Sequence, residues 1–563
     1  LTPDGRPFFA GTYFPNRDRP GLSSFRRVMA AVGDAWNNRR GEVTDQADRL
    51  NAMLGAELES VELVPSEGSL ARAYDSLARA YEPEHGGFGH APKFPQQPVL
   101  EFLLRSWEQP WAPDARAMLD HTLSRMAAGG INDQLGGGFA RYSVDRHWLV
   151  PHFEKMLYDN AQLARLYLWA GLEVNDPAHL ATARATLDYM LRDLRHSEGG
   201  FFSAEDADSE GEEGRFYTWQ YDEFVRVAGE DAPIAVERFG VSQAGNFEGS
   251  NILAIRRPLA ELAAEFGLTE SAVAAALDRA RQRLFEHRRR RVRPGLDDKV
   301  LAGWNGLAIR ALAEAGAALA VPVYRQAAEA AAGFVLDRMR RPDGGLRRSW
   351  AKGQASSVDG FLDDYASMAL GLYALYATTG TQRWFDAASS LVAQIPDRFG
   401  DGQGGLYSSE PSTLIRRPRD LFDNPSPSGT SLAAEATLIA SLYTGDQDMR
   451  ERAETYLRMS GTLIERYPSA AGYAMAVIAS LGRGTHELAV VGPSAGELGT
   501  VFWKRYRPHI VLAQSLDQVN TSAVPLLMGR GKPGTTLAYL CSGFVCLTPV
   551  ATADELEELL DNT

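Results

Sequence analysis

Helical hydrophobic periodicity runs from about residue 21 to residue 484, and it alternates between two kinds. In one kind charged residues mark a single face, as in a helix with one side in water. These segments are 69–81, 114–128, 179–195, 270–290, 324–341, 383–395 and 447–466. In the other kind the segment is apolar nearly all round, which indicates a helix buried on every side. These segments are 96–107, 157–172, 304–319, 363–377, 429–443 and 471–481. The alternation predicts an inner ring of helices wrapped by an outer ring.

A Gly-Gly connector followed by Phe or Leu recurs between these segments. Its copies are Gly86-Gly87-Phe88, Gly137-Gly138-Phe139, Gly199-Gly200-Phe201, Gly344-Gly345-Leu346 and Gly404-Gly405-Leu406. Most copies lie roughly 50–60 residues apart, which fits one helical hairpin per repeat. The longer interval has room for two units plus an insertion, which we place in 220–300. Six inner segments predict a mainly α, closed (α/α)6 toroid over 21–484, and an open helical solenoid is the alternative.

The two ends of the chain have a different pattern. In residues 1–20 Pro3-Asp4-Gly5 separates short extended runs, which predicts a β-hairpin. A lone hairpin is not stable, so we expect it to complete a sheet outside this chain, which begins at Leu1 without Met. From 485 to 563 short β-type runs alternate with Gly/Pro turns, which predicts a small α/β region ending in an acidic helix at 553–560.

Composition excludes several classes of protein. The 72 acidic and 58 basic residues give a net charge of −14, so no net basic footprint for nucleic acid exists. The basic run Arg288–Arg293 suits a helix C-terminus, and an anion site is the alternative. No apolar run is long enough to span a membrane, and the cytoplasm is the expected compartment. Cys541 and Cys546 are too few for a disulfide framework or a zinc site, and their pairing stays open.

Polar and aromatic residues crowd into Val150–Asn160, immediately before an inner segment. If a helix began at Pro151, Glu154 and Asp159 would lie about 140° apart and could not share one face. Glu154 and its i+4 neighbour Tyr158 could. Either only part of this stretch faces a pocket, or the helix begins near Asp159 and the rest is loop. Our first choice is Glu154 with Tyr158 in the pocket, Asp159 being structural, and His152 is a candidate general base.

A second cluster lies in Gly199–Trp219, where six carboxylates fall between Glu205 and Glu213 and aromatic residues frame them. Its D-A-D-S-E-G run resembles an EF-hand start, but the twelfth position from Asp206 is Tyr217, where a glutamate is required. An irregular cation site and a solvated loop are alternatives. Flat rings beside carboxylates suit a sugar, and glycoside hydrolysis needs two carboxylates several Å apart.

The N-termini of the inner helices of a toroid open on one pole, so polar residues there converge. Asp, Asn and Ser at these positions also have a plain reading as helix caps. The predicted catalytic residues are Glu154, Asp206, Asp208, Asp298 and His152. The predicted substrate-binding residues are Arg141, Tyr142, Trp148, Tyr158, Glu205, Trp219, Trp304, Asn305, Asp363 and Asp364. No metal ligand and no cofactor are predicted.

Five long motifs resemble one family, the spermatogenesis-associated, thioredoxin-domain-containing proteins. They are L-T-P-D-G-R-P-F-F-A-G-T-Y-F-P at 1–15, G-G-F-G-H-A-P-K-F-P at 86–95, G-G-G-F-A-R-Y-S-V-D-R-H-W-L-V-P-H-F-E-K-M-L-Y-D-N-A at 136–161, S-A-E-D-A-D-S-E-G at 203–211 and D-D-K-V-L-A-G-W-N-G-L at 297–307. The resemblance implies a thioredoxin-like domain followed by a six-hairpin glycosidase-like toroid. It also implies that 1–15 is the last hairpin of that domain, whose cysteine motif lies upstream.

Two functions fit these observations. In the first, the toroid pole binds a saccharide-like small molecule and acts on it with acid–base carboxylates, as a hydrolase or an epimerase does. In the second, the toroid is a non-catalytic scaffold that binds a protein or peptide for the thioredoxin-like domain. Neither function involves nucleic acid or a membrane. Because one fold serves many functions, the fold alone does not decide between them.

Overall fold

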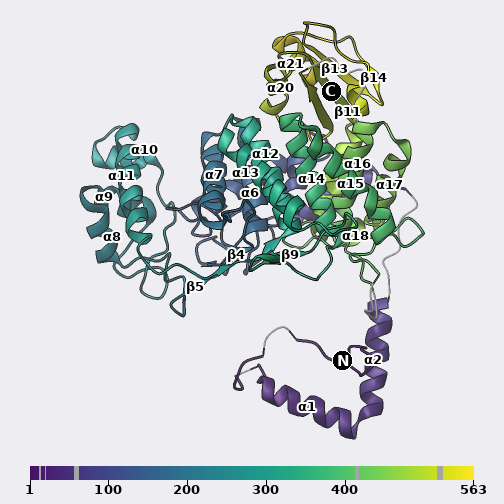
Figure 1. Ribbon diagram of the computed structural model, residues 1–563. Coiled ribbons are helices and arrows are strands. Elements are labelled where there is room, and N and C mark those ends of the chain that lie inside the picture. Colours follow the sequence, from purple (N-terminus) through teal and green to yellow (C-terminus); the bar gives the residue numbers. More distant parts are fainter. Residues whose placement is uncertain (12–13, 20, 56–62, 412–416, 517–523) are drawn as a thin grey trace. The chain divides into compact units, whose positions relative to one another are not determined.

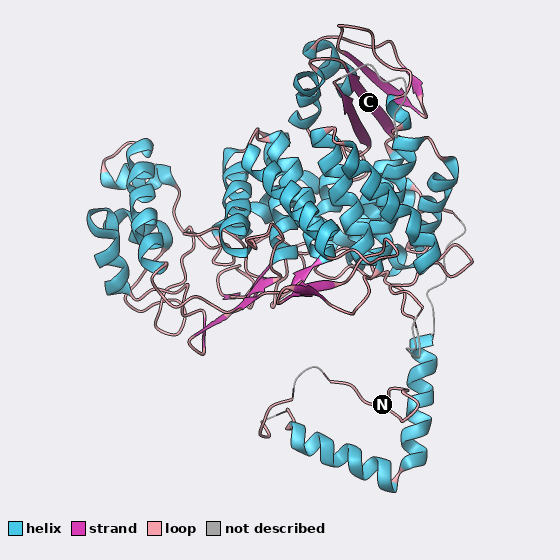
Figure 2. Ribbon diagram, in the orientation of Figure 1, coloured by secondary structure: helices cyan, strands magenta, loops and turns pink. Residues whose placement is uncertain are grey.

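The computed structural model describes residues 1–11, 14–19, 21–55, 63–411, 417–516 and 524–563 (Figures 1 and 2). It divides into two compact units, one of residues 1–60 with 411–418 and one of residues 61–410 with 419–563. The larger unit contains a ring of helices, an inserted helical cluster and a small sheet. None of the described helices is long and apolar enough to cross a membrane.

Six inner helices form a closed ring. They are α4 (Gln97–Ser106), α6 (Leu157–Val174), α12 (Ala302–Ala318), α14 (Leu362–Thr379), α16 (Gly429–Thr444) and α19 (Gly472–Gly482). Each inner helix packs against the next one, and α19 packs against α4. The closure confirms the predicted (α/α)6 toroid and excludes an open solenoid.

Each inner helix has an outer partner packed against it. The outer helices are α3 (Glu67–Ala80), α5 (Ala115–Ala128), α7 (Pro177–Tyr189), α13 (Pro322–Arg338), α15 (Gln382–Phe399) and α17 (Gln447–Arg458). The inner helices are buried almost all round, as their sequence pattern predicts. Close approach also needs glycine: a Cβ at Gly306 of α12 would lie 2.4 Å from the carbonyl carbon of Ser367 in α14.

The Gly-Gly connectors have the same structural role. The Phe or Leu that ends each connector is buried and pairs through a single β-bridge with a residue near the end of the preceding outer helix. At Phe139 and Phe201 the fourth residue of the next inner helix holds the connector. Asn160 of α6 binds the backbone N–H and carbonyl of Phe139 at 2.7 and 3.0 Å. Asn305 of α12 binds Phe201 in the same way at 2.8 and 3.0 Å.

The insertion lies between α7 and α12, within the range that the sequence suggested. Its helices are α8 (Tyr221–Ala228), α9 (Ala232–Phe239), α10 (Leu259–Phe266) and α11 (Glu270–Arg288). They enclose an apolar core of their own around Phe224, Leu262 and Val273. Short strands join the loops at the toroid pole: β3 (Lys155–Met156), β4 (Ala204–Glu205) and β7 (Leu296–Asp297) form one antiparallel sheet. The other short strands are β1 (Tyr142–Ser143), β2 (Pro151–His152), β5 (Asp208–Ser209), β6 (Glu212–Glu213), β8 (Val300–Leu301), β9 (Ser349–Ala351) and β10 (Gln354–Ala355).

The N-terminal unit contains α1 (Phe25–Asn38) and α2 (Arg40–Gly55). Phe8 packs against Val43 and Ala47 of α2. The described residues of 1–20 form turns and one isolated bridge, from Arg19 to Leu22, instead of the expected pair of hairpin strands. The physical reason is that two strands without further sheet partners are marginal in water.

The C-terminal region is the expected small α/β structure. Its sheet has the order β12-β11-β13-β14, made of β11 (His486–Val491), β12 (Ile510–Ser515), β13 (Leu537–Ser542) and β14 (Val545–Cys546). Its helices are α20 (Ala495–Gly499) and α21 (Ala553–Asp561). Strands β11 and β12 contact α16, and β12 also contacts α14, so the region packs on the toroid. Cys541 and Cys546 form a disulfide between β13 and β14.

Six charged side chains alternate in a closed ring at the centre of the toroid. In order around the ring they are Arg105, Glu101, Arg165, Glu314, Arg310 and Glu435. Successive members are joined by ion pairs of 2.7–3.0 Å, and the ring takes residues from α4, α6, α12 and α16. Although burial alone would raise it, the neighbouring arginines lower the pKa of Glu101 to about 2. Tyr506 from the C-terminal region reaches this ring, where its hydroxyl donates to Glu101.

Replacing Glu435 by Ala is expected to destabilise the toroid by about 3–5 kcal/mol, because Arg105 and Arg310 would stay buried with one carboxylate fewer. The measurement is the urea midpoint followed by far-UV circular dichroism. The matched control is Glu451→Ala on the exposed face of α17, which should change stability by less than about 0.5 kcal/mol. Equal midpoints for the two variants would show that the ring is not a unit of stability.

Candidate active site

The inner helices begin at a common pole. Near it, Gln97 of α4 bonds Asp159 of α6, and the ring of Tyr158 in α6 contacts Trp304 of α12. On the next side Gly303 of α12 donates its backbone N–H to Asp364 of α14 at 2.8 Å. These contacts bring together residues from four of the six inner helices. The starts of these four helices therefore lie near one another.

Helix α6 begins at Leu157, and residues 151–156 before it are largely extended, in β2 and β3. The alternative with a later helix start is therefore right, and a helix from Pro151 is wrong. The calculated angle of about 140° between Glu154 and Asp159 therefore does not apply, because the two residues are not on one continuous helix. Glu154 instead acts electrostatically on both Tyr158 and Asp159.

Asp159 is the least compensated acid at the pole. Its side chain is 1% exposed, and Gln97 Nε2 donates to Oδ1 at 2.7 Å. Its second oxygen, Oδ2, has no hydrogen-bond partner among the described residues. Burial raises the pKa of Asp159 well above its usual range. Asp159 therefore keeps a proton at pH values where an ordinary aspartate has lost it.

Glu154 lies in the opposite environment. His152 Nε2 and Arg141 Nη1 lie 3.6 and 3.2 Å from its Oε2, and the Arg141 backbone N–H donates to the Glu154 carbonyl at 2.8 Å. The contact with His152, and then the charge of Arg141, lower the pKa of Glu154 against the effect of burial. Contacts with Glu154 and Glu213 raise the pKa of His152. Two neighbouring carboxyl groups with opposite pKa shifts are the usual marks of an acid and a base.

Aromatic rings flank this pair. The rings of Tyr158 and Trp304 meet edge to face with their centroids 4.6 Å apart. Tyr142 stacks on His152 at 5.0 Å between centroids. Tyr142 and Trp304 are half-buried, so both keep surface that a ligand can contact.

A second group of acids lies where α14 and α16 begin. Arg348 binds Asp363 at 2.8 Å and Asp364 at 2.9 Å, and Asp364 also accepts from the Phe361 backbone N–H. Burial, together with Asp363, raises the pKa of Asp364 to about 7. Asp423 accepts backbone N–H groups at the starts of two inner helices, and burial raises its pKa to about 7. For Asp364 and Asp423 the capping interpretation is the better one. Sequence reasoning missed Asp420, which accepts from the backbone of Gly429.

Several predicted binding residues lie in the packed interior. Trp148 is fully buried, and its indole N–H donates to the His85 carbonyl at 2.9 Å. Trp219 is fully buried in the core of the insertion. Asn305 is fully buried and holds the connector at Phe201. Structural hydrogen bonds hold Trp148 and Asn305, and Trp219 packs in an apolar core, so their role here is structural.

The predicted acidic residues differ in burial and in their contacts. Strand pairing places Glu205 opposite Lys155, so stretches 150–160 and 203–219 do meet. The Glu205 carboxylate is buried, however, between Arg293 at 2.7 Å and the Tyr217 hydroxyl at 3.0 Å. Asp206, Asp208 and Asp298 are exposed, and no described contact joins them to Asp159 or Glu154. A catalytic role for these three residues stays a prediction, which the described contacts do not support.

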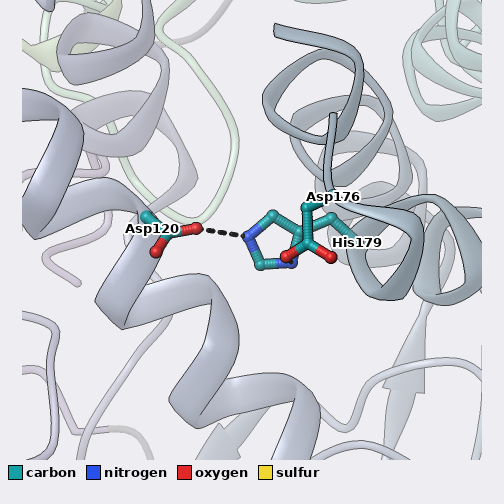
Figure 3. Close-up of side chains that lie close together, drawn as sticks. All are labelled: Asp120, Asp176 and His179. Atoms are coloured by element: carbon teal, nitrogen blue, oxygen red, sulfur yellow. Dashed lines mark hydrogen bonds and ion pairs between the residues drawn. The ribbon is translucent and has the colours of Figure 1, made fainter. Parts of the chain in front are cut away.

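Among the described residues, metal-ligand geometry occurs at another place, in Asp120, Asp176 and His179 (Figure 3). One ligand atom from each lies within 4.8 Å of the others. His179 is buried, with Nε2 2.9 Å from Asp120 and Nδ1 3.6 Å from Asp176. Asp176 also caps α7 through the Ala178 N–H at 2.7 Å. Both imidazole nitrogens thus already face a carboxylate, and the trio links α5 to α7 without an ion.

Comparisons with known proteins show what this chain resembles. The family model Thioredox_DsbH, described as a protein of unknown function (DUF255), matches residues 1–55. Spermatogenesis-associated protein 20 of Homo sapiens is 32% identical over the whole chain, which covers 78% of that protein. The Mus musculus protein of the same name is 34% identical, with 84% of this chain and 65% of that protein covered. The solved structure of a D-mannose isomerase is similar over 71% of this chain and 87% of its own, with 11% identity and a TM-score of 0.46.

Replacing Asp159 by Asn is expected to stabilise the protein at pH 8. Because the folded pKa is raised, the wild type has its full stability below the unfolded pKa of about 4 and loses stability as the pH rises toward the folded pKa. Asn does not ionise, so the variant should gain about 1.4 kcal/mol relative to the wild type for each pH unit in that window. The measurement is urea unfolding at pH 5, 6.5 and 8.

The control for this experiment is Asp206→Asn, which makes the same chemical change at an exposed position. Its stability should stay within about 0.5 kcal/mol of the wild type at all three pH values, as is usual for a surface substitution. If Asp159→Asn is instead less stable than the wild type at pH 8, the carboxylate is ionised and compensated in the folded protein, and the assignment of Asp159 as an acid is wrong.

Proposed function

The chain belongs to the spermatogenesis-associated protein 20 family, and we propose that its toroid binds a saccharide-like small molecule and acts on it by acid–base chemistry. The observation that carries the proposal is the pair of carboxyl groups with opposite pKa shifts, Asp159 and Glu154. A raised pKa suits Asp159 to the role of the acid, and a lowered pKa suits Glu154 to the role of the base. The site is the pole where the inner helices begin.

Two neighbouring side chains orient Glu154, the proposed base. Arg141 and His152 both contact Glu154 Oε2, which keeps the carboxylate ionised and fixes its direction. Glu154 is 26% exposed in its side chain, so it can reach a ligand or a water molecule. His152 has a second partner in Glu213 at 2.8 Å, and that contact orients its ring. We assign Arg141 and His152 as positioning residues for the base.

The acid is held in the opposite way. Gln97 supports one oxygen of Asp159, while the other oxygen has no hydrogen-bond partner among the described residues and is free to carry the proton. In a hydrolase reaction Asp159 would protonate the glycosidic oxygen as the bond to the sugar carbon breaks, and Glu154 would take a proton from the attacking water. In an epimerase or isomerase reaction Glu154 would remove the proton next to a carbonyl while Asp159 protonates the carbonyl oxygen. Both reactions use the same two groups in the same protonation states.

A sugar fits the surroundings of the pair. Tyr142 and Trp304 offer partly exposed rings for the apolar face of a pyranose. Asp363 is about one quarter exposed and pairs with Arg348, so it offers a carboxylate for sugar hydroxyls. These features support a saccharide over an apolar ligand. They do not distinguish one sugar from another.

The test starts with a thermal-shift screen of the protein against mono- and disaccharides. Sugars that bind are then incubated in D₂O, where proton abstraction next to a carbonyl exchanges deuterium into the product and hydrolysis releases new reducing ends. Asp159→Asn and Glu154→Gln should each lower kcat/KM by about 10²–10⁴-fold, because each removes one proton-transfer group.

The exposed variant Asp206→Asn is the matched control, and its kcat/KM should stay within about twofold of the wild type, as is usual away from a site. Turnover that survives in the double variant Asp159→Asn/Glu154→Gln would contradict the assignment of these residues. If no saccharide binds the wild type, the scaffold interpretation is favoured, and a pull-down with the full chain then becomes the informative experiment.

A further inference from the structure

A cavity of about 430 Å³ lies between the insertion and the outer layer of the toroid. Helices α5 and α7 form one wall, and α9, α10 and α11 of the insertion contribute to the other. Much of the lining is apolar and comes from Ala128, Ala185, Phe239, Ile255 and Leu277. The volume falls within the range of roughly 300–1,000 Å³ that is typical of small-molecule sites, which often lie between structural units.

Two arginines from different insertion helices line this cavity, Arg238 of α9 and Arg281 of α11. Each guanidinium is held by one backbone carbonyl: Arg238 Nη1 donates to Arg257, and Arg281 Nε donates to Gln134 at 3.0 Å. Neither has a carboxylate oxygen of the described residues within 4.0 Å of its guanidinium nitrogens. Most of their N–H donors are therefore left for another partner.

The acids that line the same cavity are engaged elsewhere or exposed. Asp133 is bound by both guanidinium ends of Arg288 at 2.8 and 2.7 Å and by Lys155 at 3.0 Å. Asp176 caps α7 and faces His179. Asp278 is exposed. The two arginines thus line the cavity without an ion pair to a carboxylate of the described residues, and burial together with Arg281 lowers the pKa of Arg238.

We propose that this cavity binds a small molecule with an anionic group, a phosphate or a carboxylate, between Arg238 and Arg281. Guanidinium groups bind both kinds of anion through paired N–H donors, and the remaining donors of the two arginines suit this geometry. The apolar body of the ligand would lie against the alanine, Phe239 and Ile255 surface. The proposal does not depend on the acid–base site, because none of the cavity residues belongs to that site.

The experiment measures binding of inorganic phosphate and of citrate to the full chain by isothermal titration calorimetry at constant ionic strength. The variants are Arg238→Gln and Arg281→Gln, and the matched control is Arg290→Gln, which removes the same charge from an exposed position outside the cavity. Saturable binding of at least one probe is expected, weakened by roughly tenfold or more in each cavity variant and by less than about twofold in the control. Comparison of the two probes distinguishes a phosphate site from a carboxylate site.

Three results would overturn the proposal. They are no saturable binding of either probe to the wild type, unchanged binding in both cavity variants, and an equal loss in Arg290→Gln, which would indicate surface attraction alone.

Near-UV circular dichroism checks that each variant is folded. If Arg238→Gln does not fold, Arg281→Gln still decides the matter, because the exposed Arg281 side chain is not part of the packed core. Arg281→Lys keeps the charge without the paired donors and should bind with intermediate affinity.

Discussion

The closed ring of three arginines and three glutamates is the interaction on which the toroid depends. Four inner helices contribute to it, and every member has two partners of opposite charge. Buried charges are costly unless they are paired, and an alternating ring is an arrangement in which no member is left over. Apolar inner helices alone would tolerate a slip along their axes, since one small apolar residue replaces another. The ring removes that freedom because a shift of one turn would separate Arg310 from Glu435.

The same electrostatic principle explains why the pole behaves differently from the centre. Glu101 has two arginines beside it and stays ionised, whereas Asp159 has one amide hydrogen bond and an oxygen with no partner among the described residues. Both are buried acids on inner helices. Nearby arginines lower the pKa of Glu101, whereas burial outweighs the weaker support of Gln97 and Arg141 and raises the pKa of Asp159. The ring of paired charges therefore stabilises the centre of the fold. The pole, where we propose a ligand site, contains a poorly compensated acid.

Much of the fold could be predicted from the sequence, because hydrophobic periodicity reports burial directly. All six inner helices and the Gly-Gly connectors followed from the pattern, and the connectors do hold the inner helices through residues such as Asn160. The ring was missed, although Glu101 and Arg105 stand out as an i,i+4 pair inside an apolar segment. Their partners come from helices far away in sequence, and spacing carries no information about that.

The candidate site was harder to predict for a related reason. The choice of Glu154 with Tyr158 for the pocket and of Asp159 for a structural role assumed a helix that begins at Pro151, and the backbone there is extended. Aromatic residues near acids, such as Trp148 and Trp219, looked like binding groups and are buried core. Residue type alone does not distinguish a ring that packs from a ring that binds.

Polar groups without partners are the most informative feature of this molecule. Two examples lie in different places. At the pole Asp159 Oδ2 has no hydrogen-bond partner among the described residues, and beside the insertion Arg238 and Arg281 have no carboxylate oxygen of the described residues within 4.0 Å. A single ligand cannot satisfy both, since one place favours a group that exchanges protons and the other favours a fixed negative charge. These features are the basis of the two proposed sites, one for acid–base chemistry and one for anion binding.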